Sequence, residues 1–439
     1  MRGVFHVRHE IVRAEDESAL TLARLIRQGY ESFQPQIAVR LWTGERLGPV
    51  DGPVVVLHDP VALSRLAFRP TITTLVELWM EKAFDIEDGT LFDIAGVKSR
   101  VKTKLALKQI GKWQVARALP ALLRLRRQGK VVHQTVGNGA GASGSTRQAI
   151  QYHYDVSNDF YRLFLDQRML YSCAYFDGWH DDIDKAQRDK LDMICRKLRL
   201  QPGERMLDIG SGWGALLIHA VSHYGVVGHG VTLSQAQFDL SRERIAEAGL
   251  SDRITIELKP FQDLSGSFDK ISSIGMFEHV GFAHHDEYFA AVHRLLEPGG
   301  LYLHHAITRP AKKTVRQFHR KSAEYKALTQ FIFPGGELDY IGHSLQKLEA
   351  FRFEVHDVEG WREHYARTLR LWANRLHANF DAAIGMIGEP RARLWLAYLV
   401  GCAISFERGD ALIQQTLASR KVKGCLLYTS PSPRDKRQS

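Results

Sequence analysis

The fold of this chain is decided by the stretch Met206-Leu207-Asp208-Ile209-Gly210-Ser211-Gly212-Trp213-Gly214. It predicts a short apolar strand, a glycine turn and a helix that begins near Ala215. Glycines at alternate positions let the backbone bend sharply and approach a ligand where a Cβ atom would block it. Asp208 stands where the strand ends, a usual place for polar ligand contacts in an open parallel sheet. A glycine-rich turn without any ligand is the plainer alternative, so the flanking sequence has to decide.

Strands and helices alternate regularly after this stretch. The expected segments are a helix over 215–224, a strand at 228–232, a helix capped by Ser234, strands at 254–258 and 270–274, a helix over 287–296 that ends at Glu297-Pro298-Gly299-Gly300, and a strand at 301–305. Such alternation predicts a parallel sheet that helices cover on both faces.

Composition limits the classes of protein that fit. The 439 residues are enough for about two or three domains. No apolar run reaches the roughly 18–20 residues of a membrane span, and charges interrupt any signal-peptide core near Met1. Four cysteines without metal spacing predict reduced thiols in a cytoplasmic protein. The net charge of +10 indicates an acidic partner, either nucleic acid or an anionic membrane surface.

Residues 1–130 predict a small N-terminal α/β domain. Strands are expected at 37–42 and 54–57, and helices at 61–68 and 71–82. Its last part, 98–130, carries eleven Lys or Arg residues and no acid, interleaved with apolar side chains. Such a basic amphipathic segment can lie on anionic lipid. Nucleic acid is disfavoured because no nucleic-acid-binding module is recognisable, and a solvated helical linker is the plainer alternative.

Composition also predicts where the domains end. Residues 131–147, which include Gly137-Asn138-Gly139-Ala140-Gly141, predict a flexible linker. A catalytic domain is expected over 148–424. Residues 425–439, from Cys-Leu-Leu-Tyr-Thr-Ser-Pro-Ser-Pro onward, resemble a translated sequencing-library adapter rather than natural sequence. We therefore assign this tail no function.

The glycine turn does not match the dinucleotide-binding fingerprint. That fingerprint needs glycine at the first, third and sixth places, whereas here glycines fall at the first, third and fifth. The next strand ends in Val231-Thr232-Leu233-Ser234, with no acid to bind a nicotinamide ribose. NAD is disfavoured, while a smaller nucleoside ligand stays open.

Three other polar residues stand where chemistry is expected. Glu278 follows the strand at 270–274, His305 ends the strand at 301–305, and Tyr365 lies on the apolar face of a helix. Taken singly, a capping acid, a packed histidine and a core tyrosine are the better explanations. The neighbouring histidines lack the spacing of a metal site, so we expect no metal.

Taken together, these segments resemble the cyclopropane-fatty-acid synthase family of S-adenosylmethionine-dependent transferases. The resemblance spans about residues 148–423, and more faintly 76–87 resemble the family's lipid-binding domain. It is carried by 171–175 (Tyr-Ser-Cys-Ala-Tyr), 207–214, 275–281 (Gly-Met-Phe-Glu-His-Val-Gly), 331–336 (Phe-Ile-Phe-Pro-Gly-Gly) and 364–369 (His-Tyr-Ala-Arg-Thr-Leu). Several long motifs in the right order are more specific than one glycine turn.

The resemblance implies a Rossmann-like, class I methyltransferase sheet of seven strands, with S-adenosylmethionine bound above the glycine turn. The residues that it implies for this donor are Tyr171, Ser172, Asp208, Gly210, Ser211, Gly212, Gly214, Thr232, Leu233, Ser234, Gln237, Phe261 and Gln262. One departure concerns Pro260, which stands where the family usually has an acid facing the adenine amine. Adenine recognition would then rest on stacking by Phe261 and on backbone groups.

The resemblance also implies the chemistry. Family members act on a cis double bond of an acyl chain, often one esterified in a membrane phospholipid. The alkene attacks the sulfonium methyl, a bound bicarbonate removes a proton from the added methyl, and a three-membered ring closes. Glu278, His305 and Tyr365 would hold the bicarbonate, with backbone groups of Cys173 and Ile307 completing the site. Cys402 matches a cysteine sometimes assigned as the active residue, although a buried small residue in an apolar run explains it more simply.

The expected activity is therefore that of a cyclopropane-fatty-acyl-phospholipid synthase, cytoplasmic and peripherally attached to the inner face of the cell membrane. Its expected partners are phospholipid acyl chains at an anionic membrane surface and no nucleic acid. The oligomeric state stays open, with a homodimer among the options. Two alternatives remain: a methyltransferase that leaves an unclosed methyl branch or methylates a small amine, and a lipid-binding protein without catalysis.

Overall fold

The computed structural model describes residues 16–96, 112–128, 157–319 and 337–422. The chain divides into two compact units. Unit 1 holds the described residues up to 128 together with 388–400, and unit 2 holds 157–319, 337–387 and 401–422. The predicted linker at 131–147, the motif at 331–336, the tail at 425–439 and parts of the basic segment lie outside the described residues.

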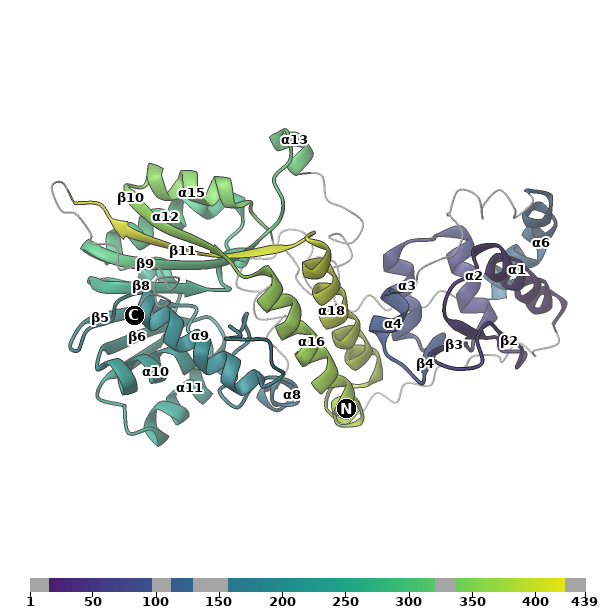
Figure 1. The fold of residues 1–439 in the computed structure, drawn as a ribbon, viewed down its shortest axis with the longest axis horizontal. Helices are drawn as coiled ribbons and strands as arrows, with labels where there is room; N and C mark the ends of the chain where they lie inside the picture. The colour runs from purple at the N-terminus through teal and green to yellow at the C-terminus, as the bar shows by residue number, and fades with distance from the viewer. Residues whose placement is uncertain (1–15, 97–111, 129–156, 320–336, 423–439) are drawn as a thin grey trace. The chain divides into compact units, whose positions relative to one another are not determined.

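Unit 2 is built on a seven-stranded sheet (Figure 1). Its strands, in chain order, are β5 (Arg205–Ile209), β6 (Val227–Thr232), β7 (Ile254–Leu258), β8 (Phe268–Ile274), β9 (Leu296–Thr308), β10 (Phe353–Gly360) and β11 (Leu412–Arg420). Their order across the sheet is β10-β11-β9-β8-β5-β6-β7, and only β11 among them runs antiparallel to its neighbours. The chain moves outward from β5 through β6 to β7 and then returns to β8. The boundary between β5 and β8 is therefore the point where the winding direction switches, the usual ligand-binding point of such sheets.

Helices cover both faces of this sheet, as the alternation predicted (Figure 1). On one face, α9 (Ile183–Lys197), α10 (Ala215–Tyr224) and α11 (Gln235–Glu247) share an apolar cluster with Met206 and Ile256. On the other face, α12 (His285–Leu295) and α15 (Ile341–Ala350) share one with Leu207 and Ile271. Met206 and Leu207 are neighbours in β5 and point to opposite faces, which is the period of a strand. The expected fold class is confirmed.

The remaining elements of unit 2 are short helices and the C-terminal helices. They are α8 (Asn158–Arg162), η1 (Phe261–Asp263), η2 (Phe277–His279), η3 (Phe282–His284), α13 (Val315–Phe318), α16 (Arg362–Ala378), α17 (Phe380–Ile387) and the second half of α18 (Glu389–Arg408).

Most of the predicted boundaries in unit 2 are confirmed to within two residues. The main correction concerns β9, which begins at Leu296 and includes the Glu297-Pro298-Gly299-Gly300 segment that we expected to be a turn. It also extends to Thr308, three residues beyond the prediction. Strand β9 pairs with β11 along eight residues, from Leu301 to Thr308, and with β8 at Leu296 and again from Leu301 onward. Residues 297–300 are therefore an irregularity within the strand, where Gly299 has a φ of 79°.

Unit 1 contains a small four-stranded sheet of order β2-β1-β3-β4. The strands are β1 (Ala38–Arg40), β2 (Arg46–Leu47), β3 (Val54–Leu57) and β4 (Phe84–Glu87). The helices are α1 (Glu17–Phe33), α2 (Pro60–Phe68), α3 (Ile72–Met80), α4 (Leu91–Ala95), α6 (Lys112–Gln128) and the first half of α18. The expected α/β character of this region is confirmed, although the first predicted strand is shorter, at three residues.

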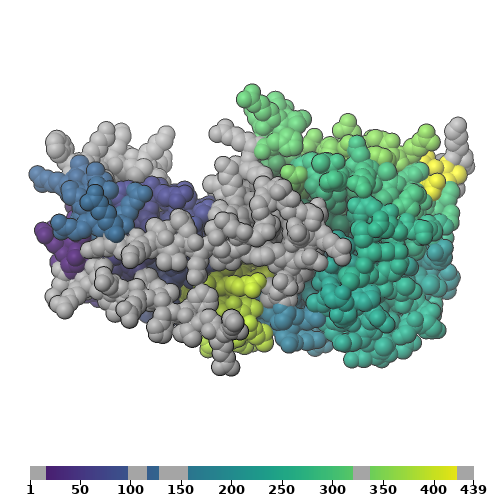
Figure 2. Space-filling view, turned by 180° about the vertical axis from the view of Figure 1, so that it is seen from behind, coloured from purple at the N-terminus to yellow at the C-terminus, as the bar shows by residue number. Residues whose placement is uncertain are grey.

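Helix α6 is the described part of the basic segment. Ala118, Leu122 and Leu125 form its buried stripe, and α6 packs on α1 and α2. Leu119 and Leu123 point outward, 46% and 39% exposed, among exposed arginines. Figure 2 shows this helix, in blue, at the surface of unit 1. Helix α6 therefore has two apolar strips: one is buried against α1 and α2, and the other, formed by Leu119 and Leu123, faces outward. Within the described residues, no helix has both the length and the apolar character of a membrane span.

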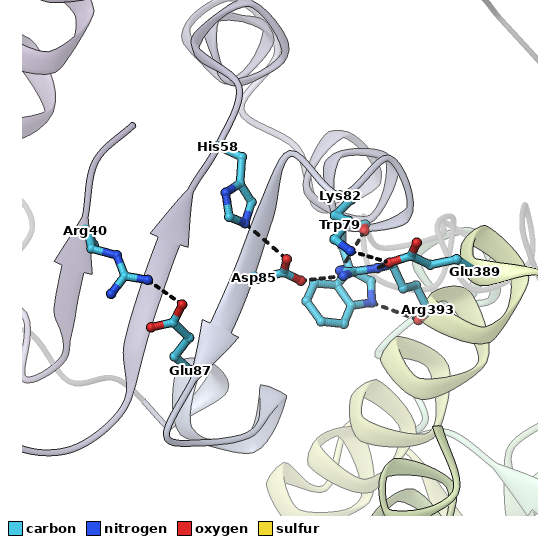
Figure 3. A network of polar contacts seen from close by, with 8 residues as sticks. All are labelled: Arg40, His58, Trp79, Lys82, Asp85, Glu87, Glu389 and Arg393. Atoms are coloured by element: carbon cyan, nitrogen blue, oxygen red, sulfur yellow. Dashed lines mark hydrogen bonds and ion pairs between the residues drawn. The ribbon is translucent and has the colours of Figure 1, made fainter. Parts of the chain in front are cut away.

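A buried arginine ties α3, β4 and α18 together within unit 1 (Figure 3). The Arg393 guanidinium lies 4.4 Å from the ring centroid of Trp79 and pairs with Asp85 and Glu389. The third nitrogen donates to the Trp79 carbonyl at 3.3 Å, and the indole Nε1 donates to the Arg393 carbonyl at 2.8 Å. His58 pairs with the other oxygen of Asp85. We call these residues the arginine cluster; every nitrogen of its buried guanidinium has an acceptor.

Candidate active site

The glycine turn after β5 has the backbone that only glycine adopts readily. Gly210, Gly212 and Gly214 have φ values of 81°, 54° and 78°. A Cβ atom on Gly210 would come within 2.9 Å of Met276 Cγ, so a side chain there is also excluded by space. The backbone N–H groups of Gly210 and Ser211 both donate to the Val231 carbonyl at 3.0 Å. These two bonds hold the turn against β6, at the edge of the sheet where the parallel strands end.

A cavity of about 510 Å³ lies at this edge, next to the switch point between β5 and β8. Its volume falls in the range of small-molecule sites. Eleven of the residues expected to bind the methyl donor line it: Tyr171, Ser172, Asp208, Gly210, Ser211, Gly212, Thr232, Leu233, Gln237, Phe261 and Gln262. Gly214 and Ser234, the N-caps of α10 and α11, are not among the lining residues.

Two buried charged groups face each other across the polar part of this cavity. Asp208 accepts a hydrogen bond from Ser272 Oγ at 2.7 Å, and burial raises the pKa of its carboxyl to about 6. Lys190, only 1% exposed, donates to Ser172 Oγ at 2.9 Å, and burial lowers the pKa of its ammonium to about 8. Each charge lowers the cost of burying the other, so the pair gives the cavity a defined polar end.

Sequence reasoning missed Lys190, although a signal was present. Helix α9 buries Ile183, Gln187, Lys190 and Ile194, which recur at the spacing of one helix face. A lysine on the buried stripe of an amphipathic helix is rarely buried without a partner. The position of Lys190 on this stripe therefore predicts that its ammonium has a buried polar partner.

Aromatic rings close the other end of the cavity. The Tyr171 ring lies 5.3 Å from Trp372 and 5.4 Å from Tyr161, and Tyr161 lies 5.2 Å from Trp213. Tyr171 and Trp213 line the cavity itself. On the adenine side expected from the sequence, Phe261 packs edge-on against Tyr288 at 5.4 Å, with Pro260 beside it in the lining. Rings arranged in this way wall a site against water and offer their faces to a cation.

Glu278 lies on η2, between cavity-lining residues Met276 and His279. Its Oε1 accepts the backbone N–H of Ile307 at 2.6 Å, which joins it to the end of β9. Its Oε2 is buried and has no hydrogen-bond partner among the described residues. Burial raises the pKa of this carboxyl to about 7, despite the hydrogen bond from Ile307. The carboxyl can therefore hold or release a proton at neutral pH.

His305 is the second buried group with a free polar atom. Its Nδ1 is 2.8 Å from Gln415 Nε2, whereas its Nε2 is buried without a partner in the described part of the chain. Burial holds the pKa of the ring well below its usual range, and the positive charges of Lys190 and Lys197 act in the same direction. The ring is thus neutral, and its Nε2 is available to a ligand.

Trp361 connects His305 to two more of the expected residues. The His305 ring packs edge-on against Trp361 at 5.2 Å. The Trp361 carbonyl accepts the Tyr365 backbone N–H at 3.0 Å and lies 3.8 Å from Cys173 Sγ. Tyr365 is buried on α16 with Leu369, Trp372 and Leu376, as its helical spacing predicted. Burial raises the pKa of the Cys173 thiol well above its usual value, so its sulfur is a neutral thiol at physiological pH.

Cys402 is the last of the residues that the resemblance implied for the reaction. It lies on α18 and is half-buried rather than fully buried.

The histidine set of the sequence is distributed over different elements. His305 and His304 belong to β9, and His284 and His285 to the start of α12. Among the described residues, the only grouping of potential metal ligands is His285, Asp339 and His343, whose ligand atoms lie within 4.8 Å of one another. The Asp339 carboxylate is already bonded to the Tyr340 N–H and to Ser344 Oγ at the start of α15. The same carboxylate contacts His343 Nδ1 at 2.9 Å, so both of its oxygens have partners within the chain.

Comparison with known proteins adds two kinds of similarity. The family described as mycolic acid cyclopropane synthetase matches residues 142–416. A probable fatty acid methyltransferase of Pseudomonas putida is 42% identical over 393 residues, which are 88% of this chain and 93% of that protein. The cyclopropane-fatty-acyl-phospholipid synthase of Escherichia coli K12 is 39% identical over 274 residues, 62% of this chain and 68% of that one.

Solved structures give the same result for the fold. The cyclopropane synthase MmaA2 of Mycobacterium tuberculosis matches with a TM-score of 0.59 and 34% identity, over 62% of this chain and 98% of that chain. The mycolic acid cyclopropane synthase CmaA1, solved with SAH and CTAB, matches with a TM-score of 0.58 and 36% identity over the same shares.

Proposed function

This chain belongs to the mycolic acid cyclopropane synthetase family, and from that membership and its site we infer a cyclopropane-fatty-acyl-phospholipid synthase. The enzyme transfers a methylene group from S-adenosylmethionine to a cis double bond of an unsaturated phospholipid acyl chain and so forms a cyclopropane fatty acid. The observation that carries this function is that Glu278 Oε2 and His305 Nε2 are both buried without a partner among the described residues, while Met276 and His279, on either side of Glu278 in the chain, line a cavity suited to the donor. Glu278 and His305 themselves are not among its lining residues.

The cavity fits an adenosyl sulfonium. A Cβ atom on Gly212 would meet nothing within 4 Å, so the turn is open to a ligand there, and Asp208, Thr232 and Gln237 supply polar groups for ribose and amino acid parts. Bound there, S-adenosylmethionine supplies an electrophilic methyl group. The rings of Tyr171 and Trp213 then exclude water and face a positive charge with their π-systems.

The orphaned polar atoms fit a small oxyanion. We assign Glu278, His305 and Tyr365 to a bicarbonate, with backbone groups of Cys173 and Ile307 completing the site. Bicarbonate supplies a weak base for the proton that the added methyl group loses. Glu278, with a pKa near 7, exchanges a proton at Oε2, which keeps the site from carrying two full negative charges. Tyr365 lies one helical turn after Trp361, whose ring packs against His305.

Methyl branching is the second candidate, because the relative with 42% identity is named a probable fatty acid methyltransferase. It would use the same donor site and differ in the last step, in which the cationic carbon takes up hydride from a separate hydride donor instead of losing a proton and closing a ring. A methylation of small amines is not favoured by any contact in the site.

One experiment separates these functions. The protein is expressed in a bacterium that lacks cyclopropane lipids, and fatty acid methyl esters are analysed by mass spectrometry. Cyclopropanation adds one CH₂ unit, whereas a saturated methyl branch adds one CH₂ unit and two further hydrogens. An unchanged profile, despite soluble expression and donor binding by calorimetry, would favour a lipid-binding protein and overturn the proposed activity.

We further propose that residues 1–130 form a lipid-binding domain, that 148–424 form the catalytic domain, and that the enzyme acts at the inner face of the cell membrane. The net charge of +10 and the outward face of α6 support this, since anionic lipid attracts arginines and accepts exposed leucines. A homodimer stays a prediction for sedimentation analysis.

Vesicle binding tests the membrane proposal. Replacing Leu119 and Leu123 by glutamine should weaken binding to anionic vesicles about tenfold, because about 1–2 kcal/mol of apolar contact is lost. Val50→Gln is the matched control, since Val50 is 83% exposed in the same unit but lies outside α6. Equal binding by all three proteins would exclude α6 as the contact.

A further inference from the structure

Three polar side chains form a row across the edge of the large sheet. Glu359 of β10 pairs in register with Gln415 of β11, and Gln415 pairs in register with His305 of β9. Directly opposed residues of antiparallel strands present their side chains on the same face. Gln415 and His305 are each 1% exposed. The row therefore leads from a half-exposed carboxylate to the buried ring of the proposed oxyanion site.

Lys197, the last residue of α9, orients this row. Its ammonium pairs with the Glu359 carboxylate and donates to Gln415 Oε1 at 2.8 Å. An ammonium has three donors and no acceptor, so the atom of Gln415 that faces it must be the amide oxygen. The amide nitrogen then faces His305 Nδ1 at 2.8 Å and donates to it. The orientation of the amide is fixed by the charge of Lys197.

A neutral imidazole carries one proton, and a nitrogen that accepts a hydrogen bond does not hold it. We propose that Lys197 and Gln415 are positioning residues that hold His305 as the Nε2–H tautomer, so that the ring presents a buried donor to an oxyanion. The identity of that oxyanion rests on the proposed function; the tautomer does not. Sequence reasoning reached His305 but neither of the two residues that set its proton.

The tautomer matters for a reaction that passes an electrophilic methyl group to an alkene. A bare imidazole nitrogen is a nucleophile that a sulfonium methyl or a cationic carbon would alkylate. An Nε2–H group has no lone pair in the ring plane at that atom, so it cannot be alkylated there, yet it binds an anion. With this arrangement the ring anchors the base and leaves proton removal to the anion.

Nitrogen-15 NMR of histidine-labelled protein tests the tautomer without any turnover. The His305 signals are assigned by their absence from the spectrum of His305→Gln. We expect the wild-type ring to show a protonated Nε2 and an unprotonated Nδ1 between about pH 6 and 8. A protonated Nδ1 would overturn the proposal, whatever the activity of the enzyme.

Gln415→Glu tests the role of the amide. A carboxylate only accepts hydrogen bonds, so His305 should move its proton to Nδ1, and Lys197 would still neutralise the new charge. Loss of the donor should raise the KM for bicarbonate and lower kcat about 10²-fold. An unchanged His305 spectrum in this variant would remove Gln415 from the proposed role.

Gln414→Glu is the matched control on the neighbouring residue. Gln414 Oε1 accepts from Thr308 Oγ1 at 2.7 Å, a bond that glutamate keeps, and its side chain points to the other face of β11. Its His305 spectrum and its kinetics should match the wild type; a shift of His305 equal to that in Gln415→Glu would contradict the proposal. A normal tautomer in an enzyme without cyclopropanation would instead contradict only the proposed function.

Discussion

The arginine cluster of unit 1 and the Glu278 and His305 site of unit 2 both bury polar groups, but their hydrogen bonding differs. In the arginine cluster of unit 1, each nitrogen of Arg393 has an acceptor, and the Trp79 indole donates back to the chain. In unit 2, Glu278 and His305 are buried as completely, but each keeps one polar atom without a partner among the described residues. An unpaired buried polar atom costs about 1–3 kcal/mol.

The difference separates polar groups that support the fold from those that serve a ligand. A paired buried charge is stabilised by the chain itself, so removing one partner harms folding. An unpaired buried group lowers stability in the free protein and gains its partner only when a ligand binds. Unpaired burial alone does not mark function, because His304 Nε2, Trp361 Nε1 and Ser273 Oγ are also buried without a partner among the described residues. It supports Glu278 and His305 because their motifs indicate the same two residues independently.

The strongest test of this contrast is the replacement Glu278→Gln. The amide keeps the acceptor for the Ile307 N–H but cannot exchange a proton near pH 7. We expect turnover to fall about 10³-fold, within the range for loss of one acid–base group, while donor affinity changes less than about threefold. Product analysis and calorimetry measure the two effects. Full activity would remove Glu278 from the site.

A matched control for this variant is Glu243→Gln, on the exposed side of α11. It makes the same chemical change away from the cavity and should leave turnover and donor affinity unaltered. An equal loss of activity in both variants would mean that charge in general, and not the carboxyl of Glu278, is required.

Arg393→Met tests the paired side of the comparison. It removes the cation–π contact with Trp79 and leaves Asp85 without its main partner. We expect the free energy of unfolding to fall by about 3 kcal/mol, at the low end for a broken buried pair because Asp85 is one quarter exposed. Chemical denaturation measures this. Donor affinity should stay unchanged, and a loss of affinity with intact stability would contradict a structural role.

The pH dependence of the free energy of unfolding isolates the contribution of the Glu278 carboxyl. The pKa of the Glu278 carboxyl rises from 4.5 in the unfolded chain to about 7 on folding. Between these values the native state holds a proton that the unfolded state has lost, so the wild type loses stability as pH rises. Glu278→Gln lacks this loss and should exceed the wild type by up to about 3 kcal/mol above pH 7, with no such gain below pH 4.5. A gain that is independent of pH would exclude the titration of Glu278 as its cause.

The sequence predicted the sheet well because its signals are local. The glycine turn, the capping residue Ser234 and the apolar strand at 254–258 each carry their conformation in a few adjacent residues, and all are found as expected. Strand β11 gave no such signal. Its buried positions include Gln415 and Thr416, so apolar alternation fails where polar groups face the site.

The sequence predicted the residues proposed to touch the ligands, but not the residues that support them. Glu278 and His305 follow from motifs, whereas Lys190, Lys197 and Gln415 act through partners far away in the chain. Lys197 reaches Gln415 across 218 positions, and no local pattern encodes such a pair. Likewise, Arg393 meets Trp79 across 314 positions, so nothing near either residue predicted the arginine cluster.

The smallest expected effect is that of replacing His58, an exposed member of the arginine cluster. His58 belongs to the arginine cluster through its contact with Asp85 at 3.1 Å, but its side chain is 44% exposed. An ion pair that water can replace contributes at most about 1 kcal/mol, so His58→Gln should lower the free energy of unfolding by less than that amount. The variant is measured by the same denaturation as Arg393→Met. If it cost as much as Arg393→Met, the strength of the cluster would lie in its network of contacts rather than in the burial of one guanidinium. A small effect would instead show that the buried guanidinium of Arg393, and not its exposed partners, contributes most of the stability of the arginine cluster.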